Sequence, residues 1–198
     1  RKFAGADTLA TSYALSQAIK KINPDIILAG RQAIDGDTAQ VGPQVAEKLG
    51  IPQVTYAEEI QEINESKVVV KRRLERGVEV VSCTLPCLVT VHATAAPCRP
   101  RHAKQVMKYK YARTVTEDTA EVANYLLSLA DYPYLKITEW GTADVGGEDS
   151  SYGMAGSPTK VKKVENIVFQ AKEAKKLTAS DEDIDSLISE LLANHTIG

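Results

Sequence analysis

The chain has 198 residues, of which 43% are hydrophobic and 25% charged, and its formal net charge is −2. This length and apolar content are sufficient for a domain with a real core. The slightly acidic balance argues against a nucleic-acid or membrane-surface binder, and no apolar run approaches the roughly 20 residues that span a bilayer. The odd number of cysteines and their spacing predict reduced thiols, no metal site and a cytoplasmic protein.

The first fifty residues alternate between helical and strand patterns. We expect a helix from about 7 to 22, a buried strand over 25–30 and a second helix over 40–49. The strand and the second helix are joined by the segment Gly-Arg-Gln-Ala-Ile-Asp-Gly-Asp-Thr-Ala-Gln-Val-Gly-Pro-Gln, residues 30–44. In an open α/β sheet such a loop binds nucleotides, because backbone N–H groups and the helix dipole favour phosphate. The pattern predicts a doubly wound nucleotide-binding sheet.

Two helix starts flank the 25–30 strand, and both are rich in small and hydroxyl-bearing residues. Together they could hold both ends of a dinucleotide, whereas the alternative is two ordinary helix caps. Arg31 could compensate charge near the loop or could be a plain surface residue. The candidate cofactor-binding residues are Asp7, Thr8, Thr11, Ser12, Gly30, Gln32, Ala33, Ile34, Asp35, Gly36, Asp37, Thr38, Ala39, Gln40 and Val41.

The middle of the chain changes to an antiparallel pattern. Short strands near 53–57 and over 87–91 enclose a hairpin of 67–74 and 78–84 with a glycine in its turn, which suits the edge of a mixed sheet. Small residues and prolines follow over 93–100. A basic stretch comes next, with no acidic residue between Glu79 and Glu117. It is either a solvated face or a docking surface for an acidic partner or a cofactor phosphate.

The C-terminal part is predicted to be less regular. We expect a helix over 117–131, carrying Val122, Tyr125, Leu126 and Leu129, and an irregular segment over 141–158. A final helix, capped by Ser180, carries one apolar stripe of Ile184, Leu187, Ile188, Leu191 and Leu192. The organisation predicted is a nucleotide-binding α/β domain over 1–130 and an extended arm over 131–198 that ends in this helix. Its own domain or a partner subunit could cover the stripe.

The sequence contains no recognisable catalytic group. Thr11 and Ser12 have no histidine or carboxylate at a spacing that marks a nucleophile, and the three histidines are scattered. Hydrolase and transferase functions therefore have little support, and we expect no catalytic side chain. A bound redox cofactor needs none, because the cofactor carries the chemistry and the protein supplies binding and orientation.

Two motifs give the chain a family resemblance. Gly-Ala-Asp-Thr-x-Ala-Thr-Ser-Tyr-Ala-Leu and Ala-Gly-Arg-Gln-Ala-Ile-Asp-Gly-Asp-Thr-Ala-Gln-Val-Gly-Pro resemble the β subunit of electron-transfer flavoprotein. The likeness continues through Leu-Pro-Cys-Leu-Val-Thr-Val at 85–91, Met107-Lys108 and Gly-Ser-Pro-Thr-Lys-Val at 156–161. It implies a heterodimer with an α subunit, which favours the partner as the cover of the final helix. It also implies a longer subunit, with N-terminal strands before Arg1.

The resemblance leaves the nucleotide open. One kind of β subunit holds AMP as a structural ligand, and another holds FAD, takes electrons from NADH and splits them between two acceptors. The Ala-Gly-Ala-Asp-Thr-x-Ala-Thr-Ser segment resembles the second kind, so FAD is expected and AMP is the alternative. The resemblance also implies an acyl-CoA dehydrogenase-type partner, docked by a loop in which we select Ala95, Arg99 and Arg101. A more distant alternative is a stand-alone adenine-nucleotide sensor.

Overall fold

A computed structural model describes residues 2–119, 127–162 and 174–197. The chain divides into two compact units, Arg1–Lys160 and Val161–Gly198, and each is described by itself. The first unit includes residues 131–160, which the sequence interpretation assigned to the arm.

The first three elements lie where the sequence predicts them: α1 at Thr8–Ile22, β1 at Ile26–Gly30 and α2 at Val41–Leu49. Each helix ends at a residue in the left-handed conformation, Asn23 for α1 and Gly50 for α2. This conformation turns the chain out of the helix and lets the next amide bond back to the last turn. The helix boundaries therefore follow from local sequence.

Five strands form one mixed sheet in the order β1-β5-β2-β3-β4. Strands β1 and β2 flank β5 and run parallel to it, whereas β3 pairs antiparallel with both β2 and β4. The expected mixed α/β fold with an antiparallel edge is confirmed. Strand β2 is longer than expected, because its second half extends past β5 and pairs with β3 alone. The strand bounds are Gln53–Ile63 (β2), Lys67–Leu74 (β3), Gly77–Thr84 (β4) and Cys87–Val91 (β5).

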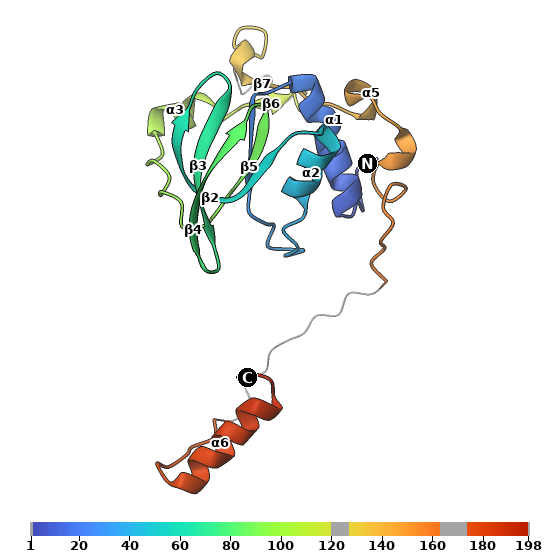
Figure 1. Ribbon diagram of the computed structural model, residues 1–198. Helices are drawn as coiled ribbons and strands as arrows, with labels where there is room; N and C mark the ends of the chain where they lie inside the picture. Colours follow the sequence, from blue (N-terminus) through green and yellow to red (C-terminus); the bar gives the residue numbers. More distant parts are fainter. Residues whose placement is uncertain (1, 120–126, 163–173, 198) are drawn as a thin grey trace. The chain divides into compact units, whose positions relative to one another are not determined.

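The core lies on both faces of β5, whose side chains alternate between two clusters. Cys87 and Val89 pack with Val54, Val68 and Val70 of the neighbouring strands on one side. On the other side Leu88 packs against Val45 and Ala46 of α2. Figure 1 shows α1 and α2 next to each other on this helical side. A strand buried on both faces is typical of a parallel sheet covered by helices.

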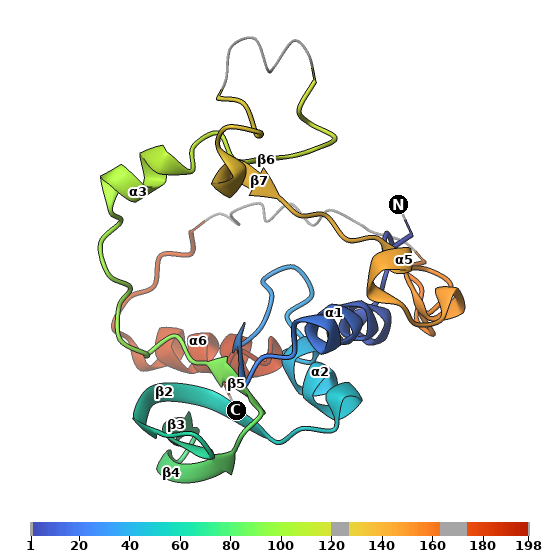
Figure 2. The same ribbon diagram turned by 90° about the horizontal axis from the view of Figure 1, so that it is seen from above.

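Residues 142–157 fold back onto α1. This segment contains α5 (Thr142–Val145) and the 3-10 helix η2 (Asp149–Ser151), and α5 lies beside α1 in both Figure 1 and Figure 2. The ring of Tyr152 is buried and meets the rings of Tyr13 and Phe3 edge to face, with centroids 5.1 and 5.3 Å away. The N–H of Asp7 donates to Ser157 Oγ at 2.9 Å. These contacts hold the start of α1.

A smaller group of elements lies between the sheet and this segment in the sequence. It comprises α3 (Ala103–Lys108), β6 (Arg113–Thr114), η1 (Pro133–Leu135) and β7 (Lys136–Ile137). The buried Arg113 bonds to Asp118 at 2.6 and 2.9 Å and to the carbonyl of Leu127. Of the helix expected over 117–131, the residues at both ends are not helical. Residues 120–126, with Val122, Tyr125 and Leu126, lie outside the described residues.

The second unit contains α6, Asp181–Ala193, at the predicted position. Ser180 caps it by accepting from the N–H of Asp183 at 3.3 Å, and three acidic residues occupy the first turn. Its apolar stripe is open, with Ile184, Leu187, Ile188 and Leu192 between 39% and 50% exposed. No helix in the described ranges is long and apolar enough to cross a bilayer.

Candidate functional site

The candidate nucleotide site is built at the carboxyl end of the parallel strands. Gly30, the last residue of β1, pairs with Val91, the last residue of β5. The loop of 31–40 leaves the sheet at this edge and leads into α2. Because α2 packs on β5, its first turn stands over the strand ends. This is where open α/β sheets bind ligands.

Gly42 sets the distance between α2 and the strand ends. A Cβ at this position would lie 2.9 Å from Thr90 Cγ2 and 3.7 Å from Ala29 Cβ. Thr90 cannot turn away freely, because it is buried and its Oγ1 accepts the N–H of Tyr56 at 3.1 Å. Only glycine allows the first turn of α2 to lie this close to β1 and β5.

The start of α2 carries no side-chain cap. Gln40 occupies the cap position without bonding to the backbone amides of the first turn. Pro43 has no N–H, so the amides of Val41 and Gly42 form the N-terminal end of the helix dipole here. A helix start of this kind accepts an anionic group such as phosphate.

The start of α1 is already occupied by a carboxylate. Asp7 Oδ1 accepts the N–H groups of Leu9 and Ala10, each at 3.0 Å. Asp7 Oδ2 accepts the N–H and hydroxyl of Thr159 at 3.1 and 2.7 Å. The hydrogen bond from Ala10, with those from Thr159 and Leu9, lowers the pKa of Asp7 below its ordinary value despite partial desolvation. Asp7 is thus a helix cap, and α1 offers its side chains rather than its amides.

The two helix starts meet through three polar side chains. Thr8 Oγ1 donates to Gln40 Oε1 at 3.1 Å and accepts from Gln44 Nε2 at 3.4 Å. Gln44 Oε1 is buried and has no hydrogen-bond partner in the described part of the chain. A buried acceptor without a partner is uncommon in folded proteins. A ligand hydroxyl or amine placed between the helices would satisfy it.

The loop itself is held by its own polar groups. Gln32 Nε2 donates to Asp37 Oδ1, and the N–H of Gly36 donates to Asp35 Oδ1 at 2.9 Å. Asp37 and Ala39 adopt left-handed φ angles of 52° and 54°. For alanine this conformation costs about 1 kcal/mol, a cost that is common at ligand-binding loops. The carbonyl of Ala33 accepts the N–H of Asp37 at 3.0 Å. The side chains of Ala33, Ile34 and Thr38 are exposed.

Two predicted site residues point elsewhere. Ser12 is buried and its hydroxyl donates to the carbonyl of Leu9 at 2.8 Å. Thr11 lines an apolar cavity of about 320 Å³ together with Phe3, Leu15 and Trp140. The structure therefore joins Thr8 to the 31–40 loop but separates Ser12 and Thr11 from that contact. Gln44 was not among the residues predicted from the sequence. It follows Gln40 by four residues, a spacing that places both side chains on the same side of the helix start.

The segment predicted to dock a partner follows β5. Ala95 is half-buried and its N–H bonds back to the carbonyl of His92 at 3.1 Å. Arg99 and Arg101 are exposed, and no ion pair within the described ranges involves either. His102 caps α3 by accepting the N–H of Gln105 at 3.4 Å. This leaves the two arginines available at the surface.

Residues 1–122 match the electron transfer flavoprotein domain. The chain belongs to the electron transfer flavoprotein family. The FixA protein of Rhizobium meliloti (strain 1021) is 35% identical over 201 residues, covering 98% of this chain and 61% of its own length. The electron transfer flavoprotein subunit beta of Megasphaera elsdenii is 41% identical over 171 residues, covering 83% of this chain and 54% of its own.

A third relative supports the same family. The subunit beta of Thermoanaerobacterium thermosaccharolyticum is 47% identical over 136 residues, covering 67% of this chain and 52% of its own length. These matches confirm the resemblance to the β subunit. The chain spans about three fifths of the length of the FixA protein that it matches.

Replacing Gly42 tests the close approach of α2 to the sheet. We expect Gly42→Ala to lower the free energy of unfolding by about 1–3 kcal/mol, because the added methyl group overpacks a fixed contact with Thr90. Gly36→Ala is the matched control, because a Cβ there meets no atom within 4 Å. Urea denaturation measures both. Equal stabilities of the two variants would contradict the role given to Gly42.

Replacing Asp7 tests the cap on α1. Asp7→Asn should cost about 1 kcal/mol at pH 7, because an amide NH₂ in place of Oδ2 cannot accept the N–H and hydroxyl of Thr159. Since the folded pKa is depressed, the ionised carboxylate stabilises the fold above its ordinary value of 3.8, and this contribution is lost as the pH falls below it. The stability difference between wild type and variant should therefore shrink in acid. Asp131→Asn, at an exposed position, is the control. A difference that is constant across pH would refute the account.

Proposed function

We propose that this chain is the nucleotide-binding part of an electron transfer flavoprotein β subunit that holds FAD. In this proposal the subunit passes electrons from NADH or an acyl-CoA dehydrogenase-type flavoenzyme to a partner redox protein. The proposal includes the bifurcating form, in which the electron pair is split between two acceptors. The alternative is a structural subunit that binds AMP.

The observation that carries the proposal is the open start of α2. Its amides lie over the strand ends because Gly42 allows close approach, and the cap position leaves them without a side-chain acceptor. Thr8 supplies a hydroxyl from the neighbouring helix, and the buried Gln44 Oε1 lacks a donor. A nucleotide offers both missing groups, namely a phosphate for the amides and a hydroxyl or amine for the glutamine.

The apolar cavity along α1 favours FAD over AMP. Its lining includes Thr11, one helical turn after Thr8, together with Ala10, Ala14 and Trp140. AMP would use only the α2 start and its surroundings. A dinucleotide carries a second, planar ring system that benefits from apolar space. The bound flavin would supply the electron transfer, and this chain's residues would bind and orient it.

The nucleotide content of the purified complex tests the proposal. Co-expressed with its α subunit, the wild-type protein should release two FAD per heterodimer. Thr8→Asp should reduce this to one, because its carboxylate repels a phosphate at the α2 start, while an acidic residue in the first turn of α1 suits the helix dipole. Thr8→Ser keeps the hydroxyl and should retain both. Release of one FAD and one AMP from wild type would favour the structural alternative instead.

The proposed partners follow from two exposed surfaces. The stripe of α6 is proposed to pack on the α subunit, because a row of apolar side chains on one helix face is suited to burial. Ala95, Arg99 and Arg101 are proposed to dock an acyl-CoA dehydrogenase-type flavoenzyme, in a contact that weakens with salt. We propose a cytoplasmic protein with neither nucleic-acid binding nor membrane insertion.

Substitutions that add one negative charge to α6 test whether its apolar stripe binds the α subunit. Leu187→Asp should weaken association with the α subunit more than tenfold, because burial of a leucine side chain contributes about 1.5–3 kcal/mol. Ser186→Asp introduces the same charge on the opposite side of the helix and serves as the control. Sedimentation velocity of the purified mixtures gives both affinities. If the two variants bind the α subunit equally, α6 does not hold the complex together.

A further inference from the structure

A second cavity opens next to the strand ends, and its lining includes Arg31, the first residue of the 31–40 loop. Its volume is about 840 Å³. Arg31 follows β1 directly and His92 follows β5, so the cavity reaches the carboxyl edge of the parallel strands. The β3–β4 turn forms its opposite wall with Leu74, Glu75 and Arg76. A volume of this size suits a nucleotide-sized ligand.

Tyr56 lines the cavity in a strained conformation. Its φ angle is +60°, which a tyrosine rarely adopts, and it lies where the pairing of β2 with β5 is irregular. Its N–H donates to the buried Thr90 Oγ1 at 3.1 Å, and its ring meets His92 edge to face with centroids 6.1 Å apart. Such strain costs about 1–3 kcal/mol and clusters at functional sites. The strain presents an aromatic ring next to His92.

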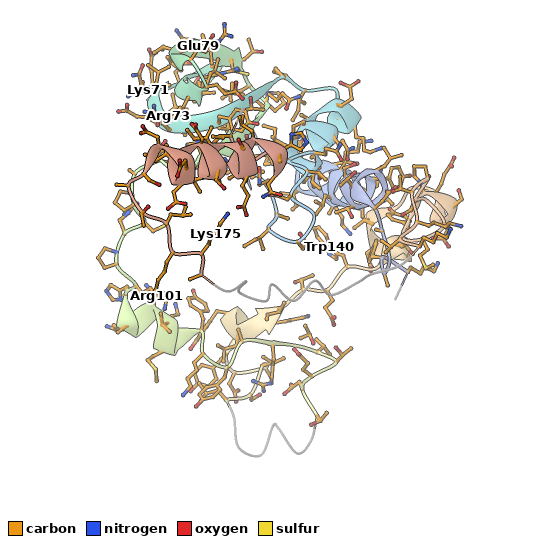
Figure 3. The ribbon with its side chains drawn as sticks, turned by 90° about the horizontal axis from the view of Figure 1, so that it is seen from below. Lys71, Arg73, Glu79, Arg101, Trp140 and Lys175 are labelled. Carbon is orange, nitrogen blue, oxygen red and sulfur yellow. The ribbon has the colours of Figure 1, made fainter. Side chains whose placement is uncertain are left out.

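The charge of the cavity is positive. Arg73 and Glu58 form an ion pair at 2.5 Å, and Thr94 also donates to this carboxylate. Figure 3 labels Arg73 on the part of the sheet that contains β3. Neither Arg31 nor Arg76 forms an ion pair in the described ranges. The lining therefore contains two guanidinium groups without an ion-pair partner among the described residues, those of Arg31 and Arg76, and one further carboxylate, that of Glu75. The sum of these three charges is positive.

We propose that this cavity is a second anion site that binds the phosphate of a nucleotide, separately from the α2 start. The guanidinium groups of Arg31 and Arg76 match the geometry of phosphate oxygens and form charge-assisted hydrogen bonds with them. The ring of Tyr56 provides an aromatic surface for a base. Arg31 is the first residue of the 31–40 loop, but the inference does not depend on FAD binding, because the phosphate is proposed to bind Arg31 and Arg76 and not the amides of the α2 start.

Isothermal titration with ADP tests the second site. The nucleotide-free full chain should bind two ADP, and Arg31→Gln combined with Arg76→Gln should bind one, with at least a tenfold loss of affinity at the cavity. Thr8→Asp should also bind one, because it removes the other site. Lys20→Gln removes a positive charge from an exposed position outside both sites and should keep two. Adenosine, which lacks phosphate, should not compete for the cavity.

Several outcomes would overturn the inference and separate it from the proposed function. A wild type that binds one ADP, lost in Thr8→Asp but kept in the double arginine variant, leaves the loop site and removes the cavity site. If the wild type binds one ADP and only the double arginine variant loses it, the cavity site stands and the loop site is excluded. If the wild type binds no ADP, both sites are excluded. Binding of a polyglutamate peptide in place of ADP, abolished by the arginine substitutions, would make the cavity a docking surface for an acidic partner.

Discussion

The contact between Gly42 and the ends of β1 and β5 is the constraint on which the site depends. A helix that starts one side chain further from the sheet would not place its amides over the strand ends. Thr90 fixes this distance from the other side, since its methyl group faces Gly42 and its hydroxyl holds the N–H of Tyr56. One buried threonine thus connects the candidate nucleotide site to the strained tyrosine of the cationic cavity.

The two helix starts have different roles even though they look alike in sequence. At α1 the protein supplies its own anion, Asp7, which also bonds to Thr159 and so ties the end of the first unit to its beginning. At α2 the protein supplies none. A phosphate would therefore bind at the N-terminal end of the α2 dipole alone, and α1 would contribute the hydroxyl of Thr8. This division is compatible with FAD and with AMP, and the proposal of FAD rests on the apolar cavity that Thr11 lines.

Much of the fold could be predicted from local patterns. Helix caps and strand periodicity placed α1, β1, α2 and the β3–β4 hairpin, because these signals lie within a few residues of the elements they set. Contacts between distant segments could not be predicted in this way. The burial of Tyr152 against Tyr13, which brings residues 142–157 onto α1, depends on a fold that neither segment encodes alone. The length of β2 likewise depends on its partner β3.

The site shows the same limit at the level of side chains. The loop and its helix could be predicted because glycine, proline and hydroxyl residues mark a strand-to-helix turn. Which hydroxyls of α1 face the 31–40 loop depends on how α1 is rotated against α2. This rotation turns Thr8 towards Gln40, whereas Ser12 is buried and bonds to the carbonyl of Leu9. The role of Gln44 emerges only when an acceptor without a partner is seen in the folded chain.

The central claim is that the open start of α2 binds the phosphate of a nucleotide. Amide chemical shifts of the ¹⁵N-labelled protein during titration with AMP, which carries the one group that the α2 start should bind, test it most directly. The account predicts that the largest shifts occur at Val41 and Gly42, with smaller shifts at Thr8 and Gln44. Saturating AMP that leaves Val41 and Gly42 unchanged, while shifting amides elsewhere or none, would contradict it.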